Sequence, residues 1–336
     1  HSRATKDPEM KRRMLITGIT GFVGSHLAEL LVGKPSLEVH GIVRWRSKTE
    51  NIEPIKHALH LHECDIRDAT AVTAVISEVR PDTTFHLAAQ SFVHASWLAP
   101  SETLSTNILG EVNLLEAVRR YCPKGIVHIA GSSEEYGLVF PSELPIKETN
   151  PLRPLSPYGV SKVAQDLLGF EYYQSYRMRI VRTRAFNTTG PRRGDVFAES
   201  NFAKQIVEIE RGLKPPVIDV GNLNAKRDYT DVRDMVRAFW LAVQHGRPGE
   251  VYNICSGRTF AMRDVLNILL RLSQIKARLQ RDPRRFRPRD VSVLQGDNRK
   301  FVRRTGWSPT IPVQQSLADL LEYWRGMIPA SRRGPR

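Results

Sequence analysis

Gly18-Ile19-Thr20-Gly21-Phe22-Val23-Gly24 follows the short apolar run Arg13-Met14-Leu15-Ile16-Thr17 and precedes a helical pattern at 25–31. The order is strand, tight turn and helix. The first glycine permits the turn, the second lets the backbone approach a pyrophosphate, and the third lets the helix pack on the strand. The helix N-terminus adds a partial positive charge. A plain strand-to-helix turn is the alternative, but the placement favours a dinucleotide site. The predicted cofactor contacts here are Gly18, Thr20, Gly21, Phe22, Val23 and Gly24.

The sequence after this turn alternates apolar strand patterns with amphipathic helix patterns. Continuous apolar strands between helices indicate a parallel sheet that is covered on both faces. We therefore predict an α/β fold, a Rossmann-type doubly wound parallel sheet with a smaller C-terminal substrate-binding α/β lobe. The predicted strands are 13–17, 39–43, 59–63, 83–89, 125–130 and 179–183, and the helices between them include 68–80, 102–121 and 158–175.

Beyond Asn187 the pattern changes to loops rich in Pro, Gly and Arg. We predict helices there at about 200–212, 231–245, 261–273 and 314–327, with short strands at 217–220 and 251–254. The expected division is a dinucleotide-binding domain at 10–186 and a substrate-binding lobe at 187–330. Residues 228–255 are expected to return to the first domain, 1–9 to be an expression remnant before Met10, and 331–336 to be a disordered tail.

Composition indicates a globular protein and narrows the classes of partner. The 336 residues are 41% hydrophobic and 25% charged, which is ordinary for a soluble domain. The net charge of +15 raises the question of nucleic acid, but no recognition motif surrounds the arginines, so we expect no specific nucleic-acid binding. Three scattered cysteines argue against a zinc site or a disulfide framework and favour reduced thiols in the cytoplasm. No apolar run approaches the roughly 20 residues needed to cross a bilayer.

The end of the second predicted strand indicates which dinucleotide binds. An acidic residue there would bind the ribose 2′-hydroxyl, whereas an arginine can pair with a 2′-phosphate. The stretch is Val43-Arg44-Trp45-Arg46-Ser47, so NADP(H) is favoured, with Arg44 the first choice and Arg46 the second, and NAD(H) left open. Asp65 and Ile66, after the third strand, are placed to meet the adenine. The small residues after the fourth strand let the cofactor come close, and the predicted contacts there are Leu87, Ala88, Ala89 and Gln90.

Tyr158 and Lys162 lie four residues apart in a predicted helix, so both side chains share one face. The ammonium is expected to favour the phenolate and to lower the Tyr158 pKa toward working pH. A proton donor to a carbonyl group needs that tuning. Ser132, at the end of the fifth strand, could hydrogen-bond the same substrate oxygen, and Glu134 could act as a base. The predicted chemistry is oxidoreduction of a sugar-like alcohol or ketone.

These motifs together resemble the extended short-chain dehydrogenase/reductases, the NAD-dependent epimerase/dehydratase family, over nearly all of residues 12–325. Phe85-His86-Leu87-Ala88-Ala89-Gln90-Ser91-Phe92-Val93 and Pro191-Arg192-Arg193-Gly194 are similar to GDP-mannose 4,6-dehydratases. Gly131-Ser132-Ser133-Glu134-Glu135-Tyr136-Gly137 and Arg227-Asp228-Tyr229-Thr230-Asp231-Val232-Arg233-Asp234 resemble GDP-6-deoxy-4-keto-D-mannose reductases. The resemblance implies a GDP-sugar site that includes Gln90, Asn187, Lys204, Asn222, Arg227, Arg287 and Asp290.

Three functions follow as hypotheses. The first is NADPH-dependent reduction of the C4 ketone of GDP-4-keto-6-deoxy-D-mannose to GDP-D-rhamnose, with Tyr158, Lys162 and Ser132 as the working groups. The second is GDP-mannose 4,6-dehydration with Glu134 as the C5 base, or the reaction of another nucleotide-sugar epimerase or dehydratase. The third is a non-enzymatic nucleotide-binding protein, which would need none of these residues. The resemblance also implies a homodimer built from helices near 102–121 and 158–175.

Overall fold

The computed structural model describes residues 11–286 and 291–329. Within them, seven parallel strands form the central sheet, in the order β10-β6-β5-β4-β1-β2-β3. From β1 the chain adds β2 and β3 on one side of the sheet, and then β4, β5 and β6 on the other side. The strand order therefore switches between β1 and β4, and the predicted doubly wound fold is confirmed. The strands are β1 (Arg12–Thr17), β2 (Leu37–Val43), β3 (Leu59–Glu63), β4 (Thr83–His86), β5 (Ile126–Ser132), β6 (Arg179–Ala185) and β10 (Val251–Ile254).

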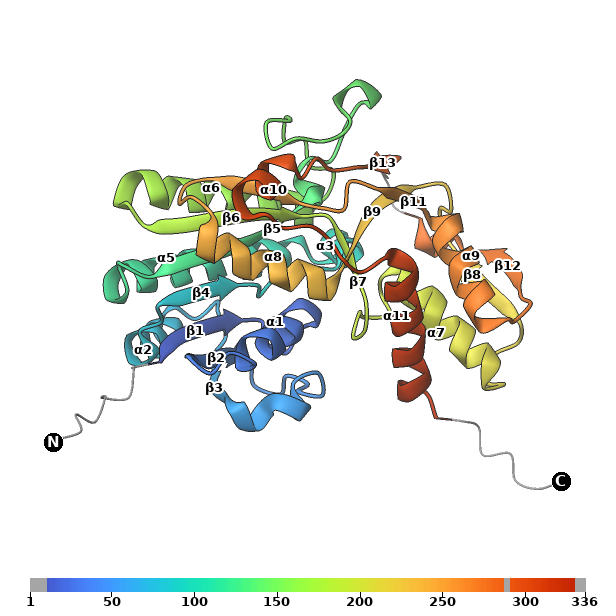
Figure 1. The fold of residues 1–336 in the computed structure, drawn as a ribbon, viewed down its shortest axis with the longest axis horizontal. Helices are drawn as coiled ribbons and strands as arrows, with labels where there is room; N and C mark the ends of the chain where they lie inside the picture. The colour runs from blue at the N-terminus through green and yellow to red at the C-terminus, as the bar shows by residue number, and fades with distance from the viewer. Residues whose placement is uncertain (1–10, 287–290, 330–336) are drawn as a thin grey trace, which may run out of the picture.

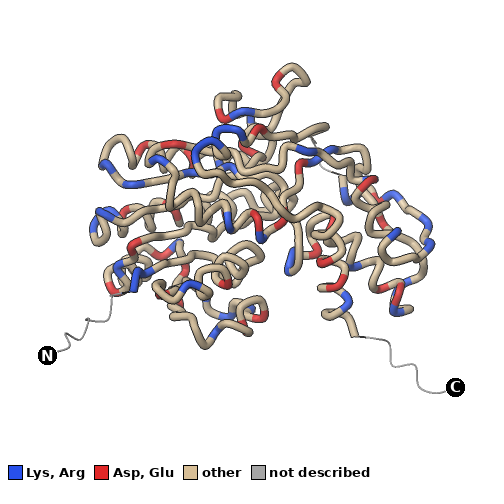
Figure 2. Tube along the Cα trace, in the orientation of Figure 1, with Lys and Arg blue, Asp and Glu red and all other residues tan. Residues whose placement is uncertain are grey.

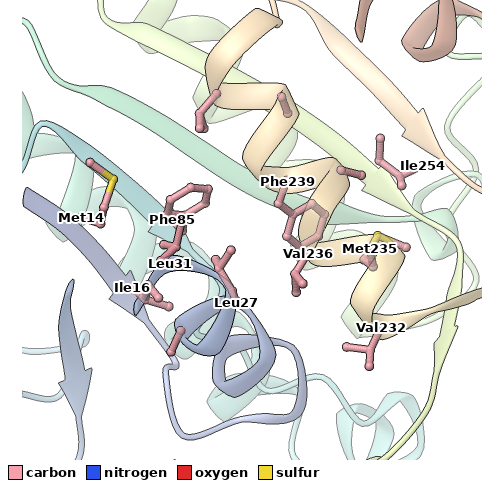
Figure 3. Close-up of a cluster of buried hydrophobic side chains, with 14 of the residues drawn as sticks. Met14, Ile16, Leu27, Leu31, Phe85, Val232, Met235, Val236, Phe239 and Ile254 are labelled. Carbon is pink, nitrogen blue, oxygen red and sulfur yellow. The ribbon is translucent and has the colours of Figure 1, made fainter. Parts of the chain in front are cut away.

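Both faces of this sheet are covered, which explains why the strands are apolar without alternation. Met14 and Ile16 pack in one cluster with α1 (Phe22–Val32) and α8 (Val232–His245). Figure 3 shows Met14 near Phe85 of β4, and Ile16 near Leu27 and Leu31 of α1. Leu15 points to the opposite face. There it packs with α2 (Ala69–Val79) and α5 (Gly110–Tyr121), and α6 (Pro157–Tyr176) joins the same core through Tyr172. Successive residues of a strand alternate between faces, so both registers of β1 must be apolar.

Local signals set the helix boundaries. The Asp68 carboxylate accepts from the first N–H groups of α2, and the Ser156 hydroxyl accepts from the Gly159 N–H at the start of α6. Pro157 occupies the first turn of α6, where its missing N–H is not needed.

The predicted helix at 102–121 is interrupted: α4 (Pro100–Leu104) passes through a π-helical segment, η2 (Ser105–Leu109), into α5. Short elements that the sequence did not indicate are α3 (Val93–Leu98), η1 (Glu53–Ala58), η3 (Ser133–Glu135) and η4 (Pro141–Glu143).

A smaller lobe stands beside the carboxyl ends of the sheet strands (Figure 1). It has a hydrophobic core of its own, formed by α7 (Ala198–Glu210), α9 (Met262–Ser273) and α11 (Val313–Met327). β8 (Val217–Val220) pairs with β12 (Arg278–Arg281), and β9 (Lys226–Asp231) pairs with three short strands. α8 instead packs against the large sheet, and β10 is an edge strand of that sheet. The remaining elements are β7 (Asn187–Thr189), β11 (Thr259–Ala261), β13 (Val293–Leu294), η5 (Pro283–Arg285) and α10 (Arg299–Thr305).

The positive charge is dispersed rather than gathered in one groove. Figure 2 shows Lys and Arg over the whole trace with Asp and Glu among them. Arg284, one of several arginines at 278–285, is exposed and pairs with Asp282 through two hydrogen bonds. In the described ranges, 11–286 and 291–329, no helix is long and apolar enough to span a membrane. No group of three or more potential metal ligands is found in these same residues.

Candidate active site

A cavity of about 500 Å³ opens at the carboxyl edge of the sheet, where the loops after several strands converge. It runs from the glycine turn to the start of α6. Ligands of open parallel sheets bind at this edge, near the point where strand order reverses. The sequence-predicted cofactor and catalytic residues in its lining are Gly18, Thr20, Gly21, Phe22, Val23, Gly24, Arg44, Asp65, Ile66, Leu87, Ala88, Ala89, Gln90, Ser132, Glu134, Tyr158 and Lys162.

The glycine turn is tightly fixed by backbone contacts. Gly18 has φ +72°, and a Cβ on it would lie 2.9 Å from the backbone of Ala88. A Cβ on Gly24 would lie 2.1 Å from the Gly18 carbonyl oxygen, so helix and strand approach closely only with glycine there. Gly21 caps α1, and the first turn of α1 contains no acidic residue. Residues 21–24 at this helix end line the cavity, and a helix N-terminus without an acidic residue suits a pyrophosphate.

The cavity lining includes the arginine predicted to select the cofactor. Arg44 follows β2 directly, and its N–H donates to the Ser47 hydroxyl at 3.2 Å. Asp65 is held by Arg67, whose guanidinium donates to both carboxylate oxygens. Arg46 lies 4.2 Å from the centre of the exposed Trp45 ring and lines a neighbouring hollow, not the main cavity. Arg44 thus has the better position of the two for a 2′-phosphate.

Ser132, Tyr158 and Lys162 meet at the inner end of the cavity. Ser132 ends β5, and its hydroxyl accepts from the Glu134 N–H at 3.2 Å and hydrogen-bonds Tyr158. Tyr158 and Lys162, in the first turns of α6, are buried. The Lys162 ammonium donates to the Ala130 carbonyl oxygen at 2.9 Å and lies 5.9 Å from the centre of the Tyr158 ring. This arrangement can hold a polar substrate oxygen between a hydroxyl and a phenol.

The expected lowering of the Tyr158 pKa is not what the structure shows. Burial raises the pKa of Tyr158, because desolvation penalises the phenolate, and the hydrogen bond with Ser132 only opposes this. The charge of Glu134, which lines the same cavity, raises the Tyr158 pKa further. Burial also lowers the pKa of Lys162 to about 8, and Glu111 and Glu135 oppose that shift. Tyr158 is therefore a neutral proton donor in this structure.

The predicted substrate residues fall into three groups. Gln90 and Asn187 line the cavity. Lys204, Asn222 and Arg227 lie outside its lining: Lys204 pairs with Asp195 at 2.6 Å, and the Arg227 guanidinium donates to the Val291 carbonyl oxygen at 2.7 Å. Arg287 and Asp290 lie outside the described residues, so their role stays a prediction.

Arg193 and Phe197 line the cavity but were not predicted as site residues. The Arg193 guanidinium lies 3.4 Å from the centre of the Phe197 ring and donates to Glu199, and its charge lowers the Tyr158 pKa. The preceding residue, Arg192, pairs with Glu29 of α1 and so ties this loop to the cofactor end. The two adjacent arginines can be recognised in the sequence, but the direction of the Arg193 side chain depends on a loop that crosses between the lobes.

Comparison with known proteins agrees with this geometry. The family model described as GDP-mannose 4,6 dehydratase matches residues 15–320. The chain belongs to the GDP-mannose 4,6-dehydratase family. The predicted resemblance is therefore confirmed.

Relatives in this family carry both of the predicted activities. A GDP-6-deoxy-D-mannose reductase of Pseudomonas aeruginosa is 31% identical over 319 residues, which cover 95% of this chain and 99% of the relative. A GDP-mannose 4,6-dehydratase of Vibrio cholerae is 34% identical over 352 residues, covering 93% of each chain. Among solved structures, RMD from Pseudomonas aeruginosa complexed with NADPH has a TM-score of 0.82 at 30% identity, covering 95% of this chain and all of that one. UDP-glucose 4-epimerase of Thermus thermophilus, complexed with NAD, has a TM-score of 0.83 at 29% identity, covering 94% and 100%.

Proposed function

We propose that this protein is a nucleotide-sugar reductase that converts the C4 ketone of GDP-4-keto-6-deoxy-D-mannose into the alcohol of GDP-D-rhamnose. The observation that carries the proposal is the Tyr158–Ser132 pair beside Lys162 at the inner end of the cavity. The full-length similarity to a GDP-6-deoxy-D-mannose reductase supports the same substrate. A neutral phenol next to a hydroxyl suits protonation of a ketone oxygen as it becomes an alkoxide.

NADPH is the proposed cofactor. The turn from Gly18 to Gly24 and the N-terminus of α1 would hold the pyrophosphate, Arg44 the 2′-phosphate and Lys162 the nicotinamide ribose. Asp65 and Ile66 would lie by the adenine. The cofactor complexed in the similar Pseudomonas aeruginosa structure is also NADPH. When bound, NADPH supplies the hydride that reduces C4.

The groups of the chain would move one proton and hold one oxygen. The Tyr158 O–H donates its proton to the ketone oxygen, and the Ser132 hydroxyl donates a hydrogen bond to the same oxygen. The positive charges of Lys162 and Arg193 stabilise the phenolate that remains on Tyr158. Phe197 and Arg193 contact each other in the lining of the same cavity. Each donor thus acts on charge that develops during the reaction.

A second candidate is the dehydratase, and Glu134 favours it. Glu134 lines the same cavity as Tyr158, and its carboxylate could take the C5 proton of an oxidised GDP-mannose there. Incubation of the purified protein with GDP-mannose alone separates the two proposals. The reductase proposal predicts no product without NADPH and the 4-keto sugar. Formation of a 4-keto-6-deoxy sugar from GDP-mannose would contradict it as the sole activity, and Glu134→Gln should then abolish that formation.

The smaller lobe is the proposed site of the GDP group. Asn187 lines the cavity at the lobe boundary, and Lys204 and Asn222 lie farther out in the lobe. Guanidinium and ammonium groups suit a diphosphate because they form charge-assisted hydrogen bonds to its oxygens. Arg287 belongs to this proposal on the strength of the resemblance. Weakened GDP binding by Arg287→Ala, with no change for the exposed Arg281→Ala, would support the placement; equal small effects would contradict it.

A homodimer in the cytoplasm completes the proposal. Val160, Leu167 and Phe170 on α6, with Leu109 of the adjoining π-helical segment, are exposed apolar side chains on the helices predicted to meet. Burying them against a second copy would remove this surface from water. The free thiols of Cys64, Cys122 and Cys255 are buried, as expected of a reducing compartment. Light scattering should give the dimer mass; a monomer at all concentrations would contradict the assembly.

A further inference from the structure

The side chain of Glu135 is fully buried in the turn that follows Ser132. Its Oε1 accepts the Ser132 N–H at 2.7 Å, and the Ser132 hydroxyl accepts the Glu134 N–H at 3.2 Å. The two bonds run in opposite directions across η3, as in a capping box, and so lock this short turn. The backbone and the hydroxyl of Ser132 are therefore fixed by the same turn.

The glycine before Ser132 makes room for the Glu135 carboxylate. Gly131 pairs with Arg184 in the register of β5 and β6. A Cβ on Gly131 would lie 2.4 Å from Glu135 Oε1 and 2.7 Å from the Thr183 carbonyl oxygen. Only a residue without a side chain lets the carboxylate fold back to the Ser132 N–H.

The second carboxylate oxygen of Glu135 lies beside a guanidinium. Arg184 Nε is 2.9 Å from Glu135 Oε2, and this oxygen has no hydrogen-bond partner in the part of the chain that the structure describes, so the contact is an ion pair. The Ser132 N–H and the guanidinium are both donors, so the carboxyl group suits them in its ionised form. Burial and the charge of Asp166 raise the pKa of Glu135, and Arg184 and the Ser132 N–H oppose that rise.

Arg184 connects the turn to α6, the helix that carries Tyr158. Its guanidinium pairs with Asp166 of α6, and Asp166 pairs in turn with Arg182 at 2.8 Å. The side chains of this cluster are at most 7% exposed, and the two carboxylates balance the two guanidinium groups in charge. Breaking a buried pair leaves an uncompensated charge. The cluster therefore holds the turn and the helix in one relative position.

We propose that Glu135 is a positioning residue: with one oxygen on the Ser132 N–H and the other on Arg184, it sets the Ser132 hydroxyl beside the Tyr158 phenol so that both reach one substrate oxygen. The inference rests on the proposed function for the identity of that oxygen, the C4 ketone. Ser132 and Tyr158 line the cavity and are hydrogen-bonded to each other. Glu135 is not one of the described residues in that lining, so it acts through Ser132.

Glu135→Gln tests the double contact because it keeps the shape of the side chain. The amide oxygen can accept from Ser132 or lie beside Arg184, and in either case the amide nitrogen meets a second donor. We expect kcat for the 4-keto sugar to fall about ten- to a hundredfold, since small displacements of a reacting group cost that much. The dissociation constant of NADPH should stay within about threefold of wild type, because Glu135 does not contact the cofactor.

η4 provides the matched control. Glu143 accepts the Phe140 N–H at 2.8 Å and pairs with Arg153, which are the same two kinds of contact in the same kind of turn. These three residues are not among the described residues that line the cavity. Glu143→Gln should therefore keep the kcat of wild type.

A double-mutant cycle with Ser132→Ala separates positioning from general damage to the fold. Ser132→Ala keeps the N–H, removes the hydroxyl and should by itself lower kcat by about 10²- to 10³-fold. If Glu135 acts through that hydroxyl, adding Glu135→Gln to Ser132→Ala should lower kcat by less than about twofold more. Effects that multiply, or a wild-type kcat for Glu135→Gln, would overturn the inference.

A second measurement depends neither on activity nor on the folding of a Glu135 variant. In wild type labelled with ¹⁵N-serine, the Ser132 amide signal is the one that is lost in Ser132→Ala. Its proton should lie far downfield of the other serine amides, as expected for a short, charge-assisted bond to a carboxylate. An ordinary shift would overturn the inference. A downfield signal in a wild type that does not reduce the 4-keto sugar would instead contradict the proposed function alone.

Discussion

The sheet edge and the smaller lobe hold their candidate polar side chains in different ways. At the sheet edge, Lys162 is fixed by the backbone oxygen of Ala130, and Tyr158 is paired with the hydroxyl of Ser132. In the lobe, Lys204 pairs with Asp195 at 2.6 Å, and Lys214 pairs with Asp219 at 2.8 Å. The first arrangement leaves the charge of Lys162 available to a ligand. A lysine of the lobe must instead give up its carboxylate partner when it binds a ligand.

This difference indicates which substitutions should have large effects on function and which should have small ones. Groups fixed by a buried backbone keep one geometry, so removing one of them changes the chemistry directly. Partly exposed ion pairs contribute about 0–1 kcal/mol, and their loss is partly offset by water and salt. Substitutions at the sheet edge should therefore change catalysis or folding strongly, and substitutions in the lobe should change binding modestly.

The largest effect is expected for Tyr158→Phe. Removal of the proton donor should lower turnover by about 10²- to 10⁴-fold, while the dissociation constant of NADPH changes little. Steady-state rates and fluorescence titration measure the two quantities. Tyr176→Phe, at the exposed end of the same helix, is the control and should behave as wild type. Near-normal turnover in Tyr158→Phe would remove this residue from the acid role.

A glycine comparison tests the packing of the two regions. Gly24→Ala places a Cβ 2.1 Å from the Gly18 carbonyl oxygen, whereas a Cβ on Gly326 in α11 meets nothing within 4 Å. Gly24→Ala should lower the free energy of unfolding by about 1–3 kcal/mol or more. Gly326→Ala should raise it by up to about 1 kcal/mol, because alanine favours helix. Denaturant unfolding measures both, and equal stabilities would contradict the close approach of helix and strand.

Cofactor selection should depend on one arginine more than on its neighbour. Arg44→Ala should raise the dissociation constant of NADPH by about ten- to a hundredfold, since a charge-assisted contact to phosphate is worth about 1.5–3 kcal/mol. Binding of NADH, which lacks the 2′-phosphate, should change little. Arg46→Ala, on the neighbouring hollow, should have a smaller effect on both. Equal weakening of NADPH and NADH by Arg44→Ala would show that this arginine does not select the cofactor.

The smallest effects are expected at the Lys204–Asp195 pair. Lys204→Ala should weaken GDP binding less than about tenfold, and Asp195→Asn should strengthen it by freeing the ammonium. Both changes should shrink as salt is added. Calorimetric titration with GDP measures them. If neither substitution changes the affinity, Lys204 is a surface residue of the lobe and the proposed GDP placement fails there.

The sequence predicted much of the sheet domain because its signals are local. Apolar strands and amphipathic helices placed β1 to β6 within a few residues, and the glycine turn and the α6 motif reached one cavity as expected. The predicted lowering of the Tyr158 pKa was wrong, because desolvation depends on atoms from many segments of the chain. Arg193 was missed for the same kind of reason, since its position depends on contacts between Arg192 and α1. The π-helical segment, η2, has no pattern that separates it from the helices on either side.

The measurement that tests the proposed reductase most directly is transfer of deuterium to the sugar from NADPH that carries deuterium at both positions of the nicotinamide C4. Purified protein is incubated with the labelled cofactor and GDP-4-keto-6-deoxy-D-mannose, and the product is examined by NMR. We predict one deuterium at C4 of the sugar for each NADPH consumed, and no conversion of GDP-mannose alone. Conversion of GDP-mannose to a 4-keto-6-deoxy sugar, with no deuterium taken from NADPH, would contradict the account.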